Sequence, residues 1–175
     1  MPRLIAVPPL FQRLAEEIDG WLELSCPDKA LERLQPMLDD PAARQAALYL
    51  RVRALVLQAQ YDAALRDVAA LRQSSMDPDW LDLTEAWCEK RVGNLPAAIA
   101  CMQNLLARNQ RSGIGHFNLG CYLALAGRLQ EALDEVTVAC GIDEEFRALA
   151  HGERDLDALV GDPRFQALLQ PRPLA

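Results

Sequence analysis

Residues 116–133 read HFNLGCYLALAGRLQEAL, which is two apolar patterns of helical period interrupted at Gly127. Apolar side chains recur every three or four positions on both sides of this glycine, as in two amphipathic helices joined by a tight turn. The same arrangement recurs upstream with a constant 34-residue period. A small residue stands at positions 59, 93 and 127, and the helix-like pattern resumes two positions later at Tyr61, Leu95 and Leu129.

A second set of positions keeps the same period and is always alanine. Its members are Ala30, Ala64, Ala98 and Ala132. Because alanine has little bulk, it lets two helices approach more closely than leucine would allow. We therefore expect each alanine to lie where the two helices of one unit cross, and the pattern predicts four such units.

The composition agrees with a chain that is almost entirely helical. Among 175 residues, 30 are leucine and 27 are alanine, whereas valine, isoleucine and threonine together number only 15. Strands are thus poorly supplied with the residues that favour them. The length and the hydrophobic content of 51% are sufficient for one domain or two very small ones, each with a core of its own.

Charge and apolar content exclude several classes of partner. The net charge of −7 makes unspecific attraction to nucleic acid or to anionic lipid unfavourable. No window approaches the roughly 20 uncharged apolar residues of a membrane span, and no signal peptide is apparent. The five cysteines are odd in number and widely separated, which is typical of a reducing compartment. These features predict a cytoplasmic protein without nucleic-acid or membrane partners.

Residues 116–139 resemble a tetratricopeptide repeat, with signature positions at Leu119, Gly120, Leu123, Gly127, Ala132, Val136 and Ala139. The resemblance implies an all-α fold, an α-solenoid of antiparallel helix pairs wound into a right-handed superhelix. It places the four repeats at residues 11–44, 45–78, 79–112 and 113–146. An irregular N-terminal arm at 1–10 precedes them, and a capping helix and frayed tail at 147–175 follow.

The C-terminal segment resembles the ending of bacterial proteins in which a helix closes a tetratricopeptide array. Asp162 is a good N-cap and Pro163 suits the first helical position. Phe165, Leu168 and Leu169 form one apolar stripe, which we expect to cover the last repeat. The residues from 171 onward, with two prolines, are expected to fray.

The inventory of reactive side chains argues against an enzyme. The chain has two histidines, four serines and two threonines, and it lacks metalloprotease, serine-hydrolase, phosphate-loop and paired-cysteine motifs. His116 stands where the family usually has a packing residue, and Cys121 is five residues away rather than the three or four that would put both on one helical face. We therefore predict no catalytic residue, no metal and no cofactor.

The strongest functional signal is the surface that the first helices of successive repeats line in this family, a concave groove for a peptide. Trp80, Leu83, Trp87 and Arg91 form one stripe by helical spacing, and such mixtures of aromatic residues and arginine are typical of binding hot spots. Alternatively, both tryptophans belong to the core. The resemblance assigns ten residues to the groove: Tyr49, Arg53, Trp80, Leu83, Trp87, Lys90, Arg91, Phe117, Asn118 and Cys121.

The helix with the two tryptophans also carries Asp82, Glu85 and Glu89 where packing residues belong. Either this helix is rotated or its acidic face is solvated, and we expect a solvated face. Its apolar stripe is then an interaction site, unless the neighbouring helices or the N-terminal arm cover it. The arm residues that could do so are Leu4, Ile5 and Val7.

The function expected from these features is that of a non-catalytic adaptor, which binds a peptide or a partner helix. A bacterial origin is suggested only by the 16 arginines against two lysines. The lysine, arginine and asparagine set with which some relatives bind a terminal carboxylate is not reproduced. Two alternatives are a secretion chaperone with the same groove and a homodimer that pairs through the first repeat by Leu10, Leu14, Ile18 and Trp21.

Overall fold

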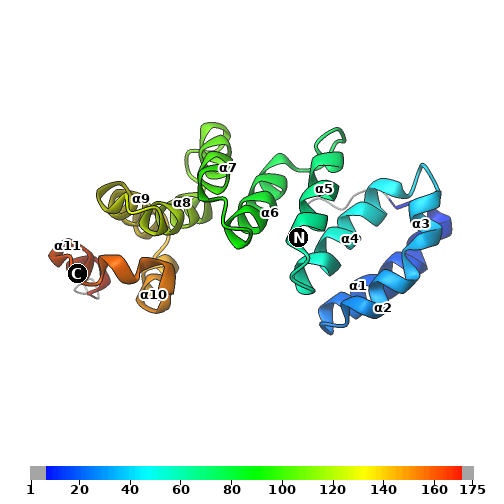
Figure 1. Ribbon diagram of the computed structural model, residues 1–175, viewed down its shortest axis with the longest axis horizontal. Coiled ribbons are helices and arrows are strands. Elements are labelled where there is room, and N and C mark those ends of the chain that lie inside the picture. The colour runs from blue at the N-terminus through cyan, green and yellow to red at the C-terminus, as the bar shows by residue number, and fades with distance from the viewer. Residues whose placement is uncertain (1–6, 171–175) are drawn as a thin grey trace. The chain divides into compact units, whose positions relative to one another are not determined.

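The computed structural model describes residues 7–170, and every regular element within that range is helical. The chain forms two compact units, Met1–Val92 and Gly93–Ala175, which are described separately below (Figure 1). The boundary falls in the turn at the middle of the third expected repeat. Leu4, Ile5 and the expected frayed tail at 171–175 lie outside the described residues.

The first unit contains a short 3-10 turn and six helices. These elements are η1 (Pro9–Phe11), α1 (Gln12–Glu23), α2 (Pro27–Arg33), α3 (Gln35–Asp39), α4 (Arg44–Leu57), α5 (Tyr61–Leu71) and α6 (Pro78–Arg91). Helix α1 packs against α2, and α4 packs against α5, so two helix pairs follow one another. The second helix of the first pair is broken into α2 and α3, because Pro36 has no N–H to continue the helical hydrogen bonds.

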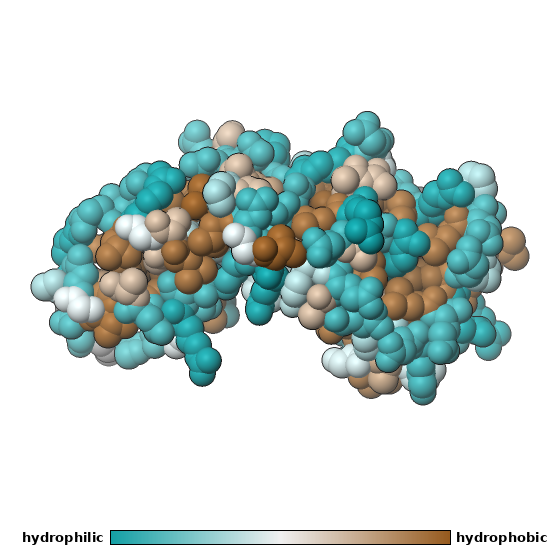
Figure 2. All heavy atoms as spheres, viewed as in Figure 1, coloured by the Kyte–Doolittle hydropathy of each residue, from teal (hydrophilic) through white to brown (hydrophobic). Residues whose placement is uncertain are grey.

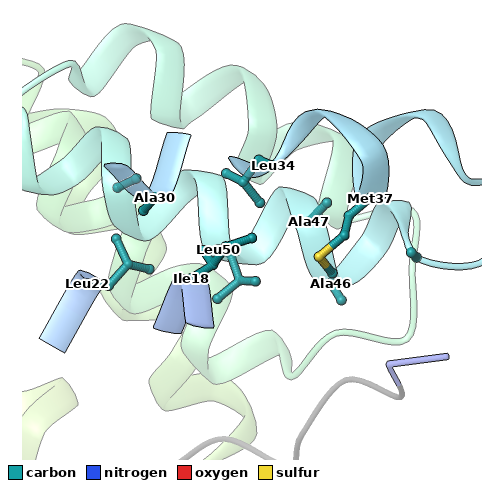
Figure 3. Packing of buried hydrophobic residues seen from close by; sticks show 10 residues of the cluster. Ile18, Leu22, Ala30, Leu34, Met37, Ala46, Ala47 and Leu50 are labelled. Atoms are coloured by element: carbon teal, nitrogen blue, oxygen red, sulfur yellow. The ribbon is translucent and has the colours of Figure 1, made fainter. Parts of the chain in front are cut away.

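The core of the first unit is built from the facing stripes of these helices. Ile18 and Leu22 of α1 meet Ala30, Leu34 and Met37 of the broken helix (Figure 3). Ala46, Ala47 and Leu50 of α4 complete this cluster. A second cluster joins the other face of α4 to α5 and α6 through residues that include Val52, Val68, Leu71 and Leu81. Helix α4 is therefore buried on two sides.

The second unit contains the remaining helices. They are α7 (Leu95–Arg108), α8 (Gly113–Leu125), α9 (Leu129–Ile142), α10 (Glu145–Gly152), the 3-10 helix η2 (Arg154–Leu159) and α11 (Pro163–Leu169). Helix α8 packs between α7 and α9, and η2 packs on α8. None of the described helices in either unit is long and apolar enough to span a membrane.

The turns inside the repeats share one backbone conformation. Among the described residues, φ is positive at Ser25 (54°), Ala59 (56°), Gly93 (84°) and Gly127 (77°), four positions that follow the period of the repeat. In the turns at Ser25, Ala59 and Gly127, two hydrogen bonds close the preceding helix in a Schellman motif, such as the one from Gln60 N–H to the carbonyl of Leu55 (2.8 Å). The sequence pattern marked only positions 59, 93 and 127 as turn residues and missed Ser25. The repeat is therefore more regular in backbone conformation than in residue type.

This conformation predicts opposite effects for two substitutions. A left-handed φ costs an alanine about 1 kcal/mol more than a glycine. Ala59→Gly should therefore raise the free energy of unfolding by about 0.5–1 kcal/mol, and Gly127→Ala should lower it by about 1 kcal/mol. A Cβ on Gly127 would meet no atom within 4 Å, so only backbone strain is tested. Urea unfolding followed by circular dichroism measures both changes, and a loss of stability in Ala59→Gly would contradict the explanation.

The C-terminal segment follows the same period. Second helices begin at Pro27, Tyr61, Leu95 and Leu129, and α11 begins at Pro163, in register with them. The segment was expected to hold one capping helix, but it contains three elements. They resemble a fifth, shortened helix pair, in which α10 and η2 together replace the first helix and α11 is the second helix.

Helix α11 is capped and anchored within this segment. Asp162 accepts a hydrogen bond from the N–H of Arg164, as predicted for the N-cap, and Phe165 is buried. Leu168 and Leu169 of the expected apolar stripe are half-buried. Buried Arg147 of α10 donates hydrogen bonds to the carbonyls of Leu168 and Gln170 and so holds the far end of the helix.

The four alanines of the repeat are all fully buried, each at the fourth position of its helix. Helices α8 and α9 approach each other closely. A Cβ built on Gly120 would lie 2.6 Å from Val136 Cγ2 and 3.0 Å from the carbonyl oxygen of Ala132. The absence of side-chain bulk at Gly120 and Ala132 thus sets the distance between these two helices.

Candidate functional site

The first unit contains a groove of about 440 Å³ on the side formed by its first helices. Three helices line it: α1 contributes one leucine, α4 contributes a stripe of helical spacing and α6 contributes the stripe with both tryptophans. Figure 2 shows apolar residues gathered between polar ones on the visible face of this unit. The lining residues are Leu22, Val52, Arg53, Val56, Leu57, Trp80, Leu83, Thr84 and Trp87.

One end of the groove is an aromatic cluster. The rings of Tyr49 and Trp80 are 4.9 Å apart between centroids and tilted by 52°. The guanidinium carbon of Arg53 lies 5.6 Å from the centre of the Tyr49 ring. Each of these side chains is half-buried, so this cluster is at the edge of the core and reaches the surface.

Arg53 is held in place by carboxylates of α1. Its Nη1 binds Asp19, and its Nη2 lies 3.1 Å from Glu23 Oε1. Partial burial disfavours the charged guanidinium, but the hydrogen bond to Asp19 and the nearby negative charges outweigh this and raise the pKa of Arg53. The positive charge of Arg53 is therefore balanced within the unit, and the residue links α1 to α4.

Trp87, two helical turns after Trp80 on α6, also lines the groove and is 40% exposed. The guanidinium carbon of Arg91 lies 4.3 Å from its ring centre, and Lys90 Nζ lies 5.8 Å from it. Such cation–π contacts favour a fixed orientation of the ring and of the arginine. The alternative that both tryptophans are core residues is wrong for Trp87, whereas Trp80 is half-buried at the edge of the second core cluster.

The acidic residues of α6 do not form a solvated face, which corrects the expectation from the sequence. Asp82 is only 1% exposed and accepts a hydrogen bond from Arg72 Nη2 at 2.7 Å. Glu85 Oε2 lies 2.7 Å from Nε of the same arginine, and Glu89 is half-buried. Arg72, at the end of α5, supplies the counter-charge that makes this burial favourable. The acidic side of α6 thus faces α5, which turns the tryptophan side towards the groove.

The three expected groove residues of the second unit lie on α8. Phe117 is 5% exposed and packs on Phe146 of α10, with ring centres 5.4 Å apart. Cys121 is buried and Asn118 is half-buried. Phe117 and Cys121 are therefore core residues rather than surface residues; Phe146 of α10 packs on Phe117, and η2 also packs on α8.

Five lining residues were missed from the sequence: Leu22, Val52, Val56, Leu57 and Thr84. A helical-spacing signal existed for two of them, since Val52 and Val56 continue the stripe that begins at Tyr49. Leu57 and Leu22 carry no such signal: Leu57 is 48% exposed and resembles an ordinary surface residue, whereas Leu22 is buried and resembles an ordinary core residue of α1.

The remaining reactive side chains have structural surroundings. His116 is half-buried, with Nδ1 2.5 Å from Glu135 Oε2 and Nε2 3.0 Å from the carbonyl of Gln110. Burial, together with the charges of Glu89 and Glu85, raises the pKa of Cys88 to about 11, so its thiol is protonated at neutral pH. Among residues 7–170, no three His, Cys, Asp or Glu side chains are grouped to hold a metal ion.

The apolar stripe of α1 that would support a homodimer is largely used within the chain. Ile18 is fully buried, and Leu14 and Trp21 pack against the same core cluster. Lys29 Nζ lies 4.3 Å from the Trp21 ring. Only Leu10, which is 83% exposed, remains strongly accessible, and pairing through this helix stays a prediction.

Comparison with known proteins identifies the fold. No family model matches the sequence, and neither does any curated protein. The MamA RS-1 ArsTM double mutant is similar in structure, with a TM-score of 0.72 and 12% identity over 93% of this chain and 96% of that one. YrrB, a TPR protein with an unusual peptide-binding site, has a TM-score of 0.63 and 16% identity over 89% of this chain and 88% of its own. The chain thus has the all-α solenoid fold of tetratricopeptide-like helix pairs.

Proposed function

We propose that the protein is a non-catalytic binding module that holds a short peptide of a partner protein in the groove of its first unit. The observation that supports this most directly is an apolar groove on three successive first helices, with an exposed tryptophan beside an arginine. Deep apolar floors with a few polar groups at the edge are typical of ligand sites. The peptide-binding site named for YrrB, which has the same fold, supports the same class of ligand.

The distribution of burial within the groove favours a peptide with apolar side chains. Leu22 and Val52 form a buried floor, whereas Leu57 and Trp87 are 48% and 40% exposed. Covering the exposed pair would remove apolar area from water, which contributes about 25 cal/mol for each square ångström. Tryptophan and arginine are also the residues that most often dominate binding energies. Two apolar side chains of a peptide, one against each wall, satisfy this geometry.

We further place this module, as an adaptor, in the cytoplasm of a bacterium. The five cysteines, all of which are among the described residues, form no disulfide, and four of them are buried, as expected in a reducing compartment. The predominance of arginine over lysine supports the bacterial origin. A secretion chaperone would use the same groove, but it would bind many unfolded chains with little sequence preference, whereas an adaptor selects a defined motif.

Selection from a phage-displayed library of random 12-residue peptides tests the proposal. Peptides enriched on the wild-type protein are synthesised, and their affinities are measured by fluorescence polarisation. Trp87→Ala should weaken binding by about tenfold or more, since removal of a central aromatic anchor costs about 1.4 kcal/mol or more. Val160→Ala, which truncates a 56% exposed residue of the second unit, is the matched control and should leave affinity unchanged.

The same experiment separates the alternatives. Enrichment without a shared motif, together with binding of unfolded proteins, would indicate the chaperone. Equal affinities for wild type and Trp87→Ala, with the helical content unchanged, would mean that peptides do not use this groove and would overturn the proposal.

A further inference from the structure

We propose that the peptide carries an aspartate or glutamate side chain next to its apolar anchors and that Arg91, not Arg53, recognises it. This inference rests on the proposed function and specifies the ligand of the same groove. It follows from the different surroundings of the two arginines. The nine lining residues include no carboxylate, and Asp19 and Glu23, which contact the lining residue Arg53, are paired with it.

Arg53 is already committed to contacts within the chain. Both of its terminal nitrogens bind carboxylates of α1, Asp19 and Glu23. A ligand carboxylate at Arg53 would have to approach beside these two like charges, whose repulsion makes binding there unfavourable. Arg53 is therefore a positioning residue, which fixes the aromatic end of the groove by holding α1 against α4.

Arg91 has the opposite arrangement. Its guanidinium lies over the Trp87 ring, and within the described part of the chain no carboxylate lies within ion-pair distance of it. The guanidinium carbon lies 4.3 Å from the ring centre, and the planar guanidinium can bind a carboxylate in a bidentate manner through its N–H donors. The ring also restricts the side chain, so less conformational entropy is lost when a carboxylate binds.

The position of Arg91 indicates a side-chain carboxylate rather than a chain terminus. Arg91 contacts Trp87 from outside the nine lining residues, beside the groove. The backbone of a peptide anchored on Trp87 can therefore continue past the arginine while one side chain turns towards it. Within the groove the apolar anchors supply most of the affinity, and the carboxylate supplies selectivity.

Peptide selection on charge-altered variants tests this inference. Phage display presents peptides fused at their C-terminus, so any acidic preference must come from side chains. We expect wild-type protein to enrich apolar peptides with a neighbouring aspartate or glutamate. Arg91→Gln should still enrich apolar peptides but lose the acidic preference, with about fivefold weaker binding of the wild-type peptide, as for an exposed pair of about 1 kcal/mol. Binding to wild type should weaken with added salt, and binding to Arg91→Gln should not.

The outcomes separate this inference from the proposed function. Enrichment of apolar peptides without acidic residues, or an acidic preference that persists in Arg91→Gln, would overturn the role of Arg91 and leave the groove as the peptide site. Tighter binding of a synthetic peptide whose free C-terminal carboxylate replaces its acidic side chain would instead assign a terminal carboxylate and also overturn it. Binding that is insensitive to Trp87→Ala would overturn the proposed function itself. Arg66→Gln, at an exposed arginine of α5, serves as the charge-matched control and should change neither preference nor affinity.

Discussion

Gly120→Ala is expected to destabilise the second unit by about 2–3 kcal/mol, although alanine is the better helix former. The added Cβ would lie 2.6 Å from Val136 Cγ2 and 3.0 Å from the backbone oxygen of Ala132. A β-branched residue in a helix has one strongly preferred χ1 rotamer, so Val136 cannot turn away at low cost. The carbonyl of Ala132 belongs to α9 itself, so α8 and α9 must move apart.

The same substitution at a different glycine of the same unit provides the control. A Cβ on Gly141, near the end of α9, would meet nothing within 4 Å. Gly141→Ala should therefore be neutral or raise the free energy of unfolding, by up to about 1 kcal/mol. Urea unfolding by circular dichroism, with hydrogen exchange of α8 and α9 to localise the effect, compares the two variants. Equal stabilities would mean that the close approach of α8 and α9 is not required by the fold.

Arg72→Met is expected to destabilise the first unit by about 3 kcal/mol. The arginine binds two carboxylates of α6, and one of them, Asp82, is almost completely buried. When a buried carboxylate loses a counter-charge, its desolvation is less fully compensated, which is more costly than the loss of an exposed ion pair. The hydrogen bonds to Asp82 and Glu85 raise the pKa of Arg72 against the effect of its partial burial, so the guanidinium is charged at every relevant pH.

A double-mutant cycle tests the physical reason for this loss. In the Asp82→Asn background, residue 82 carries no buried negative charge for Arg72 to neutralise. Arg72→Met should therefore lower the free energy of unfolding by distinctly less there than in the wild type. Arg66→Met, at an exposed position of α5, is the control and should change stability by no more than about 0.5 kcal/mol. A cost of Arg72→Met that is equal in both backgrounds would show that packing of the arginine, and not its charge, holds α6 against α5.

The repeat could be predicted from the sequence because its markers are single residues with local conformational or steric requirements. Glycine at positions 93 and 127 marks residues that need a positive φ, and the four alanines mark positions without room for a larger side chain. Both requirements act on single residues at a constant spacing, so they remain visible without any knowledge of distant contacts. Ser25 shows the limit of such markers, since its turn has the same conformation without a glycine.

The candidate site was predictable in part, for a related reason. The stripe of Trp80, Leu83 and Trp87 follows from helical spacing, and its residues line one groove. The spacing does not say which residues another element covers. Phe117 occupies a similar position on α8, yet Phe146 of a later helix packs over it. Similar positions in the repeat therefore differ in exposure because of contacts that the repeat does not encode.

Helix type, the 34-residue period, the second-helix starts and the positions of the four repeated alanines could be predicted from the amino-acid sequence alone, because each leaves a mark on single residues at a constant spacing. Three features depended on tertiary contacts: the burial of Asp82, the burial of Phe117 and the different surroundings of Arg53 and Arg91. Asp82, Phe117 and Arg53 each have a partner on another helix, and the burial of a side chain or the pairing of a charge depends on that partner rather than on the residue itself.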